Sequence, residues 1–193
     1  MELVSLYLFV FLGLFSPGPN VILLTASGAR FGFARTIPHI LGVVLGVGVI
    51  AALAGLGLGV VVWEYPVLRV ALSFMAAGWI AYLAWRMWHT TAPQNASSAR
   101  PFTFLQAVLF QWINPKLWGV AMTAIAFVPV PYAPVQAAMA MGAAFAGVNL
   151  FVCAFWAMFG QALSAILNSP RGFQAFMRIM AVILLFSASM IFI

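Results

Sequence analysis

Long apolar stretches alternate with short polar connections along nearly the whole chain. A helix needs about 20 apolar residues to cross a bilayer, and six stretches of this sequence reach that length. They cover residues 3–26, 37–63, 67–88, 102–128, 134–159 and 173–193. The longest connection is rich in Thr, Ser, Pro, Gln and Asn, which is typical of a solvated linker. The pattern predicts an all-α polytopic membrane protein of six transmembrane helices, without a separate globular domain.

The composition supports the same class of protein. The chain is 66% hydrophobic and only 5% charged, whereas a soluble domain carries about 25% charged residues. So few polar groups cannot cover a water-facing surface. The net charge is +6, but the basic residues stand singly at the ends of the spans. We therefore interpret them as determinants of membrane topology rather than as a nucleic-acid-binding surface.

The distribution of these charges predicts the orientation. Six spans place both termini on one side, together with Glu2, Glu64 and Arg69. The opposite side carries Arg30, Arg35, Arg86, Arg100, Arg171 and Arg178. The positive-inside rule then predicts that the arginine-rich loops face the cytoplasm and that both termini lie outside. His39 begins the second span on the cytoplasmic side and is predicted to lie at the membrane interface.

Two of the six spans contain sequences that break a helix. Ser16-Pro17-Gly18-Pro19-Asn20 interrupts the first span, and Asn114-Pro115-Lys116 interrupts the fourth. Proline removes a backbone donor, so a broken span is tolerated only where it faces protein or a watery cavity. At a rise of 1.5 Å per residue the breaks begin about 20 Å and about 18 Å into their spans, near the membrane midplane. Paired breaks of this kind indicate the binding site of a transporter.

The chain also repeats weakly. Sliding it by 96 positions superposes Pro19 on Pro115 and lays the first three spans on the last three. Because each half has an odd number of spans, the halves must be inverted relative to each other. We therefore expect a single membrane transporter domain over 1–193, with repeats of about 1–95 and 96–193.

Lys116 is the one ionisable residue deep within a predicted span. A cation at the bilayer centre costs about 2.5–3.5 kcal/mol even on the mildest scale. The chain has no Asp, and Glu2 and Glu64 are expected at the outer interface. The counter-charge must then be a helix C-terminus, a carbonyl cluster or a bound anion. Two interpretations stay open: Lys116 binds a substrate carboxylate, or it bonds freed carbonyls around Pro115 and braces the break.

The break in the first span should expose the N-terminus of a half-helix that starts near Asn20. Such an end presents free amide donors and a positive dipole, which suit an anionic group. Asn20 and Asn114 either hold a substrate ammonium or cap the freed backbone. The predicted substrate-binding residues are Pro17, Gly18, Pro19, Asn20, Asn114, Pro115 and Lys116.

Other polar and small residues in the spans have structural interpretations. Gly42 and Gly46 stand four apart and predict close helix packing. Gln106, Gln111 and Asn149 are expected to be buried amides, which either line a polar path or bond between helices.

No motif in the sequence predicts an enzyme. There is no His/Cys/Asp/Glu cluster with metal-ligand spacing, no phosphate-binding loop of the G-x-x-x-x-G-K-[ST] type and no pair of carboxylates. We therefore expect no catalytic residue, no metal site and no cofactor. The single cysteine, Cys153, is predicted to pack as a small apolar group.

The two broken motifs resemble those of the LysE/RhtB family of amino-acid exporters. SPGPN at 16–20 and NPK at 114–116 carry the resemblance, with Gly42 and Gly46 as further matches. The stretches GWIAYLAWRMW and CAFWAMFGQAL are most similar to the cysteine/O-acetylserine exporter branch. The resemblance implies efflux of small amino acids or their derivatives, of the cysteine/O-acetylserine or homoserine/threonine type. It also implies a bacterial inner membrane and an ion gradient as the driving force.

Together these features predict a secondary transporter that works by alternating access. Its partners are a small amino-acid substrate and the lipid bilayer, and no nucleic acid. A proton is the favoured coupling ion, although the spans hold no acid. Either Lys116 or His39 titrates, or the coupling is to something other than protons, or the carrier is a facilitator. The sequence leaves monomer and homodimer open. The alternative, an ion or metal transporter or channel of similar architecture, would require oxygen-rich acids within the membrane.

Overall fold

The computed structural model describes residues 2–58, 64–90, 100–129, 132–166 and 169–189, and these form helices without any strand. The prediction of an all-α protein is confirmed for this part of the chain. The elements are α1 (Glu2–Phe15), α2 (Pro19–Phe31), α3 (Phe33–Gly55), α5 (Pro66–Trp88), α6 (Phe104–Trp112), α7 (Pro115–Ala124), the short 3-10 helix η2 (Ile125–Phe127), α8 (Pro134–Ile166) and α9 (Pro170–Ser189).

The first predicted break separates α1 from α2, whose axes are bent by 60°. Pro19 occupies the first turn of α2, where the missing proline N–H costs nothing because those amides have no partner within the helix. Gly18 precedes it in an extended conformation, with φ −174°. The backbone between the two helices is therefore non-helical, as the two prolines predict.

The second predicted break separates α6 from α7. Ile113 and Asn114 leave the helix, and Pro115 again begins the next one. The two halves have 9 and 10 residues, so neither alone reaches the length of about 20 residues that a membrane span needs. The same device, a proline at the first helical position, thus restarts the helix in both halves of the chain.

Three of the described helices are long and apolar enough to cross a membrane: Phe33–Gly55, Val70–Trp88 and Pro134–Ala165. The bent pair α1 and α2 would make a fourth span. The pair α6 and α7, and α9 with Arg171 and Arg178 in its sequence, do not meet the same criteria. The membrane class is supported, while the count of six spans stays a prediction.

The predicted bounds of the second span were wrong. Helix α3 begins at Phe33, because Gly32 with φ +81° provides the turn that separates it from α2. It ends at Gly55 rather than at residue 63, and Gly57 follows with φ +84°. A positive φ of this kind is readily available only to glycine and ends a helix. Residues 59–63 lie outside the described part of the chain.

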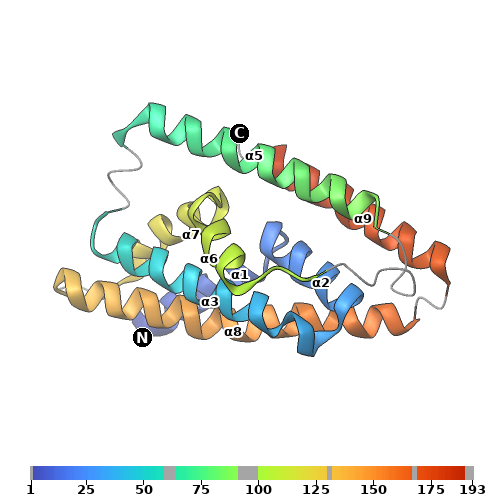
Figure 1. Cartoon of the computed structure of the whole chain (residues 1–193). Helices are drawn as coiled ribbons and strands as arrows, with labels where there is room; N and C mark the ends of the chain where they lie inside the picture. Colours follow the sequence, from blue (N-terminus) through green and yellow to red (C-terminus); the bar gives the residue numbers. More distant parts are fainter. Residues whose placement is uncertain (1, 59–63, 91–99, 130–131, 167–168, 190–193) are drawn as a thin grey trace.

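Figure 1 shows the arrangement of these helices. Helices α3 and α8 pack along each other, α1 and α2 pack against α8, and α6 and α7 pack against α3. Helices α5 and α9 form a separate pair that contacts the rest mainly through α2. The main core includes Leu24, Val47, Leu117 and Phe145. The two broken helices thus pack against the central α3–α8 pair and also contact each other through α1 and α7.

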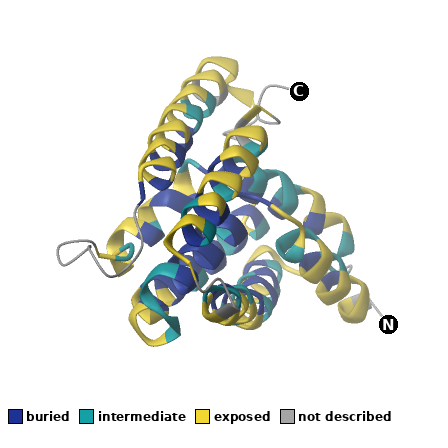
Figure 2. Cartoon of the chain, turned by 90° about the vertical axis from the view of Figure 1, so that its right-hand side faces the viewer, coloured by how far each residue is buried: buried dark blue, intermediate teal, exposed yellow. Residues whose placement is uncertain are grey.

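The outer faces of the helices are apolar and exposed (Figure 2). Val67 is 83% exposed, Phe151 76% and Met139 69%. Soluble monomers rarely expose large contiguous apolar patches. This surface fits acyl chains as its surroundings, in agreement with the composition.

Glycines set the closest approaches between helices. A Cβ at Gly42 would lie 2.7 Å from Cβ of Ala107, and one at Gly46 would lie 2.7 Å from Cγ of Gln111. Gly42 and Gly46 therefore let α6 pack close to α3, and a larger residue at either position would displace α6. This contact holds Gln111, one turn before the second break, against the centre of the molecule.

A closer approach, which the sequence pattern does not predict, joins α2 to α8. A Cβ at Gly28 would collide with the backbone carbonyl of Ala157, and one at Gly160 would collide with that of Thr25. The two helices are in backbone contact at this crossing. Small residues permit this kind of approach between membrane helices.

Candidate functional site

Lys116 joins the two breaks. From the first turn of α7 its Nζ donates hydrogen bonds to the Ser16 carbonyl at 2.6 Å, the Ser16 Oγ at 2.8 Å and the Pro17 carbonyl at 3.3 Å. An ammonium has three donors, so all of them are used. The carbonyls are free because the helix stops at this point. Of the counter-charges expected for Lys116, the structure shows a cluster of carbonyl groups. These carbonyls belong to the first break and not to the backbone around Pro115.

A pair of side-chain amides forms a second link between the breaks. Asn20 Nδ2 donates to Gln111 Oε1 at 2.8 Å, and Gln111 Nε2 donates to Asn20 Oδ1 at 3.2 Å. Gln111 also donates to the Ala107 carbonyl and is fully buried. Gln111 was expected either to line a polar path or to bond between helices, and the structure shows a bond between helices. The amide of Asn20 is paired in the same way.

This amide pair leads to a prediction on stability. Gln111→Leu leaves the amide of Asn20 without its partner, and an unsatisfied buried polar group costs about 1–3 kcal/mol. Replacing both residues by leucine should recover much of that loss, because two apolar groups leave nothing unpaired. A double-mutant cycle on unfolding in detergent micelles should give a coupling energy of at least about 1 kcal/mol. Additive effects of Asn20→Leu and Gln111→Leu would show that the pair contributes no net stability.

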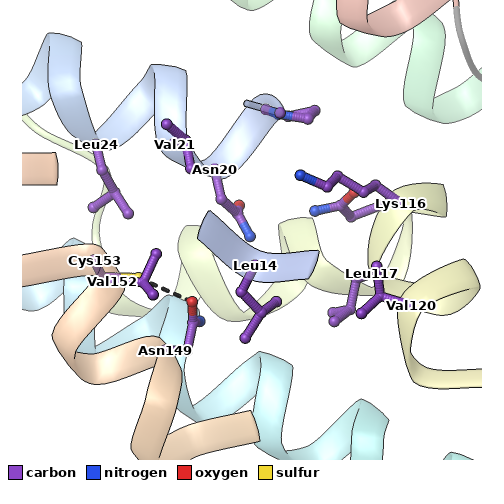
Figure 3. A pocket seen from close by; sticks show the side chains of 13 residues that line it. Leu14, Asn20, Val21, Leu24, Lys116, Leu117, Val120, Asn149, Val152 and Cys153 are labelled. Carbon is purple, nitrogen blue, oxygen red and sulfur yellow. Dashed lines mark hydrogen bonds between the residues drawn. The ribbon is translucent and has the colours of Figure 1, made fainter. Parts of the chain in front are cut away.

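A small cavity lies between the two breaks and α8 (Figure 3). The space open to the centre of a water molecule is about 20 Å³, which is room for one or two waters. Five of the seven predicted residues line it, whereas Pro17 and Pro115 do not. The lining consists of Leu14, Gly18, Pro19, Asn20, Val21, Leu24, Asn114, Lys116, Leu117, Val120, Asn149, Val152 and Cys153.

Helix α8 supplies a wall of the cavity that the prediction did not include. Asn149, Val152 and Cys153 line it, and the Cys153 thiol donates to Asn149 Oδ1 at 3.4 Å (Figure 3). Residues four apart share one face of a helix, so the spacing of Asn149 and Cys153 carried a signal. In a helix that is apolar on nearly every face, however, the sequence does not indicate which face is turned toward the breaks.

Two buried polar atoms at the cavity have no hydrogen-bond partner in the described structure. They are Oδ1 of Asn114 and Nδ2 of Asn149, in residues that are each 3% exposed. Buried polar atoms in folded proteins nearly always have a partner. One is an acceptor and the other a donor, so together they suit a ligand that carries both kinds of group.

The electrostatics of the cavity are asymmetric. The N-termini of α2 and α7 both lie at it, through Pro19 and Asn20 and through Lys116 and Leu117. Helix N-termini present unpaired amides and the positive end of the dipole. The two residues that follow α1, Ser16 and Pro17, supply the carbonyls that hold the Lys116 ammonium. An anionic group is therefore favoured beside α2 and α7, and a cationic group beside the end of α1.

His39, which the sequence predicts near the membrane interface, is not part of this site. It is 2% exposed, inside α3, and its ring lies 5.1 Å from that of Phe102 between centroids. The chain before α6 covers it, which a pattern of single helices does not predict. It lines a second cavity, described below.

Comparisons with known proteins find a matching family and several relatives of this chain. The profile of the LysE type translocator family matches residues 11–193. A cysteine/O-acetylserine efflux protein of Escherichia coli (strain K12) is 28% identical over 117 residues, and that of Escherichia coli O1:K1 / APEC is 27% identical over the same length. Each match covers 60% of this chain and 60% of the relative. No solved structure matches the chain.

Proposed function

Since the chain belongs to the LysE type translocator family, we propose that it is a secondary transporter that exports a small amino acid or amino-acid derivative from the cytoplasm. The substrate we favour is of the cysteine or O-acetylserine type, because the relatives described above bear that name. The observation that carries the proposal is the meeting of two broken helices at one cavity, with two unpaired buried amide atoms beside it.

The substrate would bind as a zwitterion. Its carboxylate would lie at the N-termini of α2 and α7 and take up donors of Lys116, because all three are positive. Its ammonium would donate to Oδ1 of Asn114, which has no partner in the protein. Nδ2 of Asn149 would then donate to an acceptor in the substrate's side chain, such as an acetyl carbonyl. Each unpaired atom of the cavity would thereby gain a partner.

Lys116 would act as a latch between the two breaks. In the structure its three donors are all bound to Ser16 and Pro17, so a substrate carboxylate must compete with these groups. Taking the ammonium from them would loosen the link between the breaks. The cavity has room for water alone, so opening is needed before a substrate can enter. Binding would thus favour the conformation in which the latch is released.

Alternating access would come from rocking of two inverted repeats, about 1–95 and 96–193, in six spans. The packing supports this division: α1 and α2 lie against α8, α6 and α7 lie against α3, and α3 and α8 lie against each other. Exchanging the halves maps these particular contacts onto one another. In the proposed orientation both termini are periplasmic in a bacterial inner membrane, and the arginine-rich ends of the helices are cytoplasmic. A proton gradient is the driving force we favour.

Efflux from loaded cells tests the proposal. Cells that express the protein should export labelled cysteine or O-acetylserine faster than cells without it and should survive a toxic cysteine load. Asn114→Leu and Asn149→Leu should each lower export about tenfold, because each removes one substrate hydrogen bond. Gln174→Leu is the matched control, since this amide of α9 does not line the cavity. Export of neither compound would reject the substrate class, and equal export by all variants would reject the site.

A further inference from the structure

A second cavity, here termed the arginine cavity, lies where the end of α2 meets α3, α5, α9 and the chain before α6. Its space open to the centre of a water molecule is about 80 Å³. This is larger than the space in the cavity between the two breaks, here termed the central cavity. Three guanidinium side chains line it: Arg30 of α2, Arg86 of α5 and Arg100 before α6. Three cations from three segments thus meet at one cavity.

No carboxylate side chain can neutralise these three cations. The chain contains only two acidic residues, Glu2 and Glu64. Glu64 precedes α5 while Arg86 lies in its last turn, and the 22 intervening steps span about 33 Å of helix. Glu2 begins α1 and Arg30 lies in the last turn of α2, so two helices separate them. Arg86 is also close enough to Arg30 to repel it electrostatically.

Buried polar groups hold this arrangement in place and leave donors unused. Arg30 Nη1 donates to Thr90 Oγ1 at 3.1 Å, and Thr90 Oγ1 donates in turn to the Arg86 carbonyl at 2.9 Å. Nε of Arg30 is buried without a partner, and so are both ring nitrogens of His39, which is 2% exposed and lines the same cavity. Unpaired donors at a cluster of cations point to a missing anion.

We infer that the arginine cavity binds a phosphate group. Guanidinium is planar and matches the oxygens of phosphate with paired hydrogen bonds. Inorganic phosphate carries up to two negative charges, which compensates three arginines better than a single carboxylate. The phosphodiester of an anionic phospholipid headgroup carries one negative charge but presents the same kind of oxygens to a guanidinium group. Apolar side chains such as Leu23, Leu83 and Met177 line the rest of the cavity and would contact the glycerol end of a lipid.

This site is distinct from the central cavity. Arg30 follows Asn20 by ten residues in α2, which corresponds to about 15 Å along the helix. None of the three arginines lines the central cavity. The inference therefore does not depend on the proposed export, and changes at the arginines can be studied by binding alone.

Binding is measured on the purified full-length protein after removal of lipid in detergent. One arm adds inorganic phosphate against chloride at equal ionic strength, and the other adds phosphatidylglycerol against phosphatidylcholine. The readouts are the midpoint of thermal unfolding and the bound mass in native mass spectrometry. Stabilisation by inorganic phosphate would identify a free anion as a ligand, and stabilisation by phosphatidylglycerol alone would identify a headgroup. Either result supports the inference, and absence of both overturns it.

Substitutions of single arginines distinguish binding at the arginine cavity from nonspecific attraction of anions to a positively charged protein. Arg30→Gln and Arg86→Gln should each weaken binding by about tenfold to a hundredfold, because each removes a charge-assisted contact. Arg171→Gln removes the same charge from an exposed position of α9 outside the cavity, and should change binding less than twofold. Arg86 is itself exposed, so its variant should keep the fold even if the Arg30 variant does not. Equal losses in Arg86→Gln and Arg171→Gln would overturn the inference.

Discussion

Cells that carry Lys116→Ala should lose amino-acid export while the protein is still made and inserted into the membrane. The variant removes the cation that the substrate carboxylate would bind and the three hydrogen bonds that join the breaks. Contacts to a charged group contribute about 1.5–3 kcal/mol each. Export should therefore fall by at least about 100-fold, measured as efflux per amount of protein in the membrane.

Two controls make this result specific. Arg171→Ala removes an equal charge from outside both cavities and should export normally. Ser16→Ala removes the hydroxyl acceptor of Lys116, together with the bond from that hydroxyl to the Gly13 carbonyl, and leaves both backbone carbonyl contacts of Lys116, so it should lower export by less than the Lys116 variant. Undiminished export by Lys116→Ala would exclude this residue from the substrate site.

Replacing Gly28 or Gly160 by leucine should destabilise the protein more than the other substitutions described above. At both positions the added side chain meets backbone of the facing helix, which cannot rotate away as a side chain can. Overpacking costs about 1–3 kcal/mol even where side chains can adjust, so we expect more here. The yield of monodisperse protein in mild detergent should fall severely, and the midpoint of unfolding should drop.

The matched control for this change lies on the same helix. Gly147 of α8 has nothing within 4 Å of the place where a Cβ would stand, so Gly147→Leu adds the same side chain without a collision. Its yield and unfolding midpoint should remain close to those of the unchanged protein. Equal behaviour of Gly147→Leu and Gly160→Leu would show that α2 and α8 are not in backbone contact.

The breaks could be predicted from the sequence because they depend on local chemistry. Proline removes a donor and clashes with the preceding turn whatever surrounds it, so Pro19 and Pro115 marked the starts of α2 and α7. The predicted repeat led us to expect that the two breaks lie close together, and residues of both line one cavity. The residues on either side of the breaks could then be proposed as a group, and five of the seven line the cavity.

The contacts that the sequence did not predict depend on how the helices are rotated against one another. These helices are apolar on nearly every face, so periodicity does not identify the buried face as it does in a soluble protein. Therefore the pairing of Asn20 with Gln111, the wall formed by Asn149 and Cys153, and the burial of His39 were not predictable. The contact through Gly160 depends on a crossing of helices far apart in the chain.

Binding of a substrate between the two breaks can be measured directly at Cys153. This residue is the single cysteine of the chain and lines the cavity. It is 1% exposed, so a maleimide reaches it only when the cavity opens. In membranes that export cysteine or O-acetylserine, the rate of Cys153 alkylation by a small maleimide should be measured with and without O-acetylserine. We expect O-acetylserine to slow alkylation, with half the effect at the concentration that half-saturates export. Alkylation at the same rate at every concentration of an exported substrate would contradict the account.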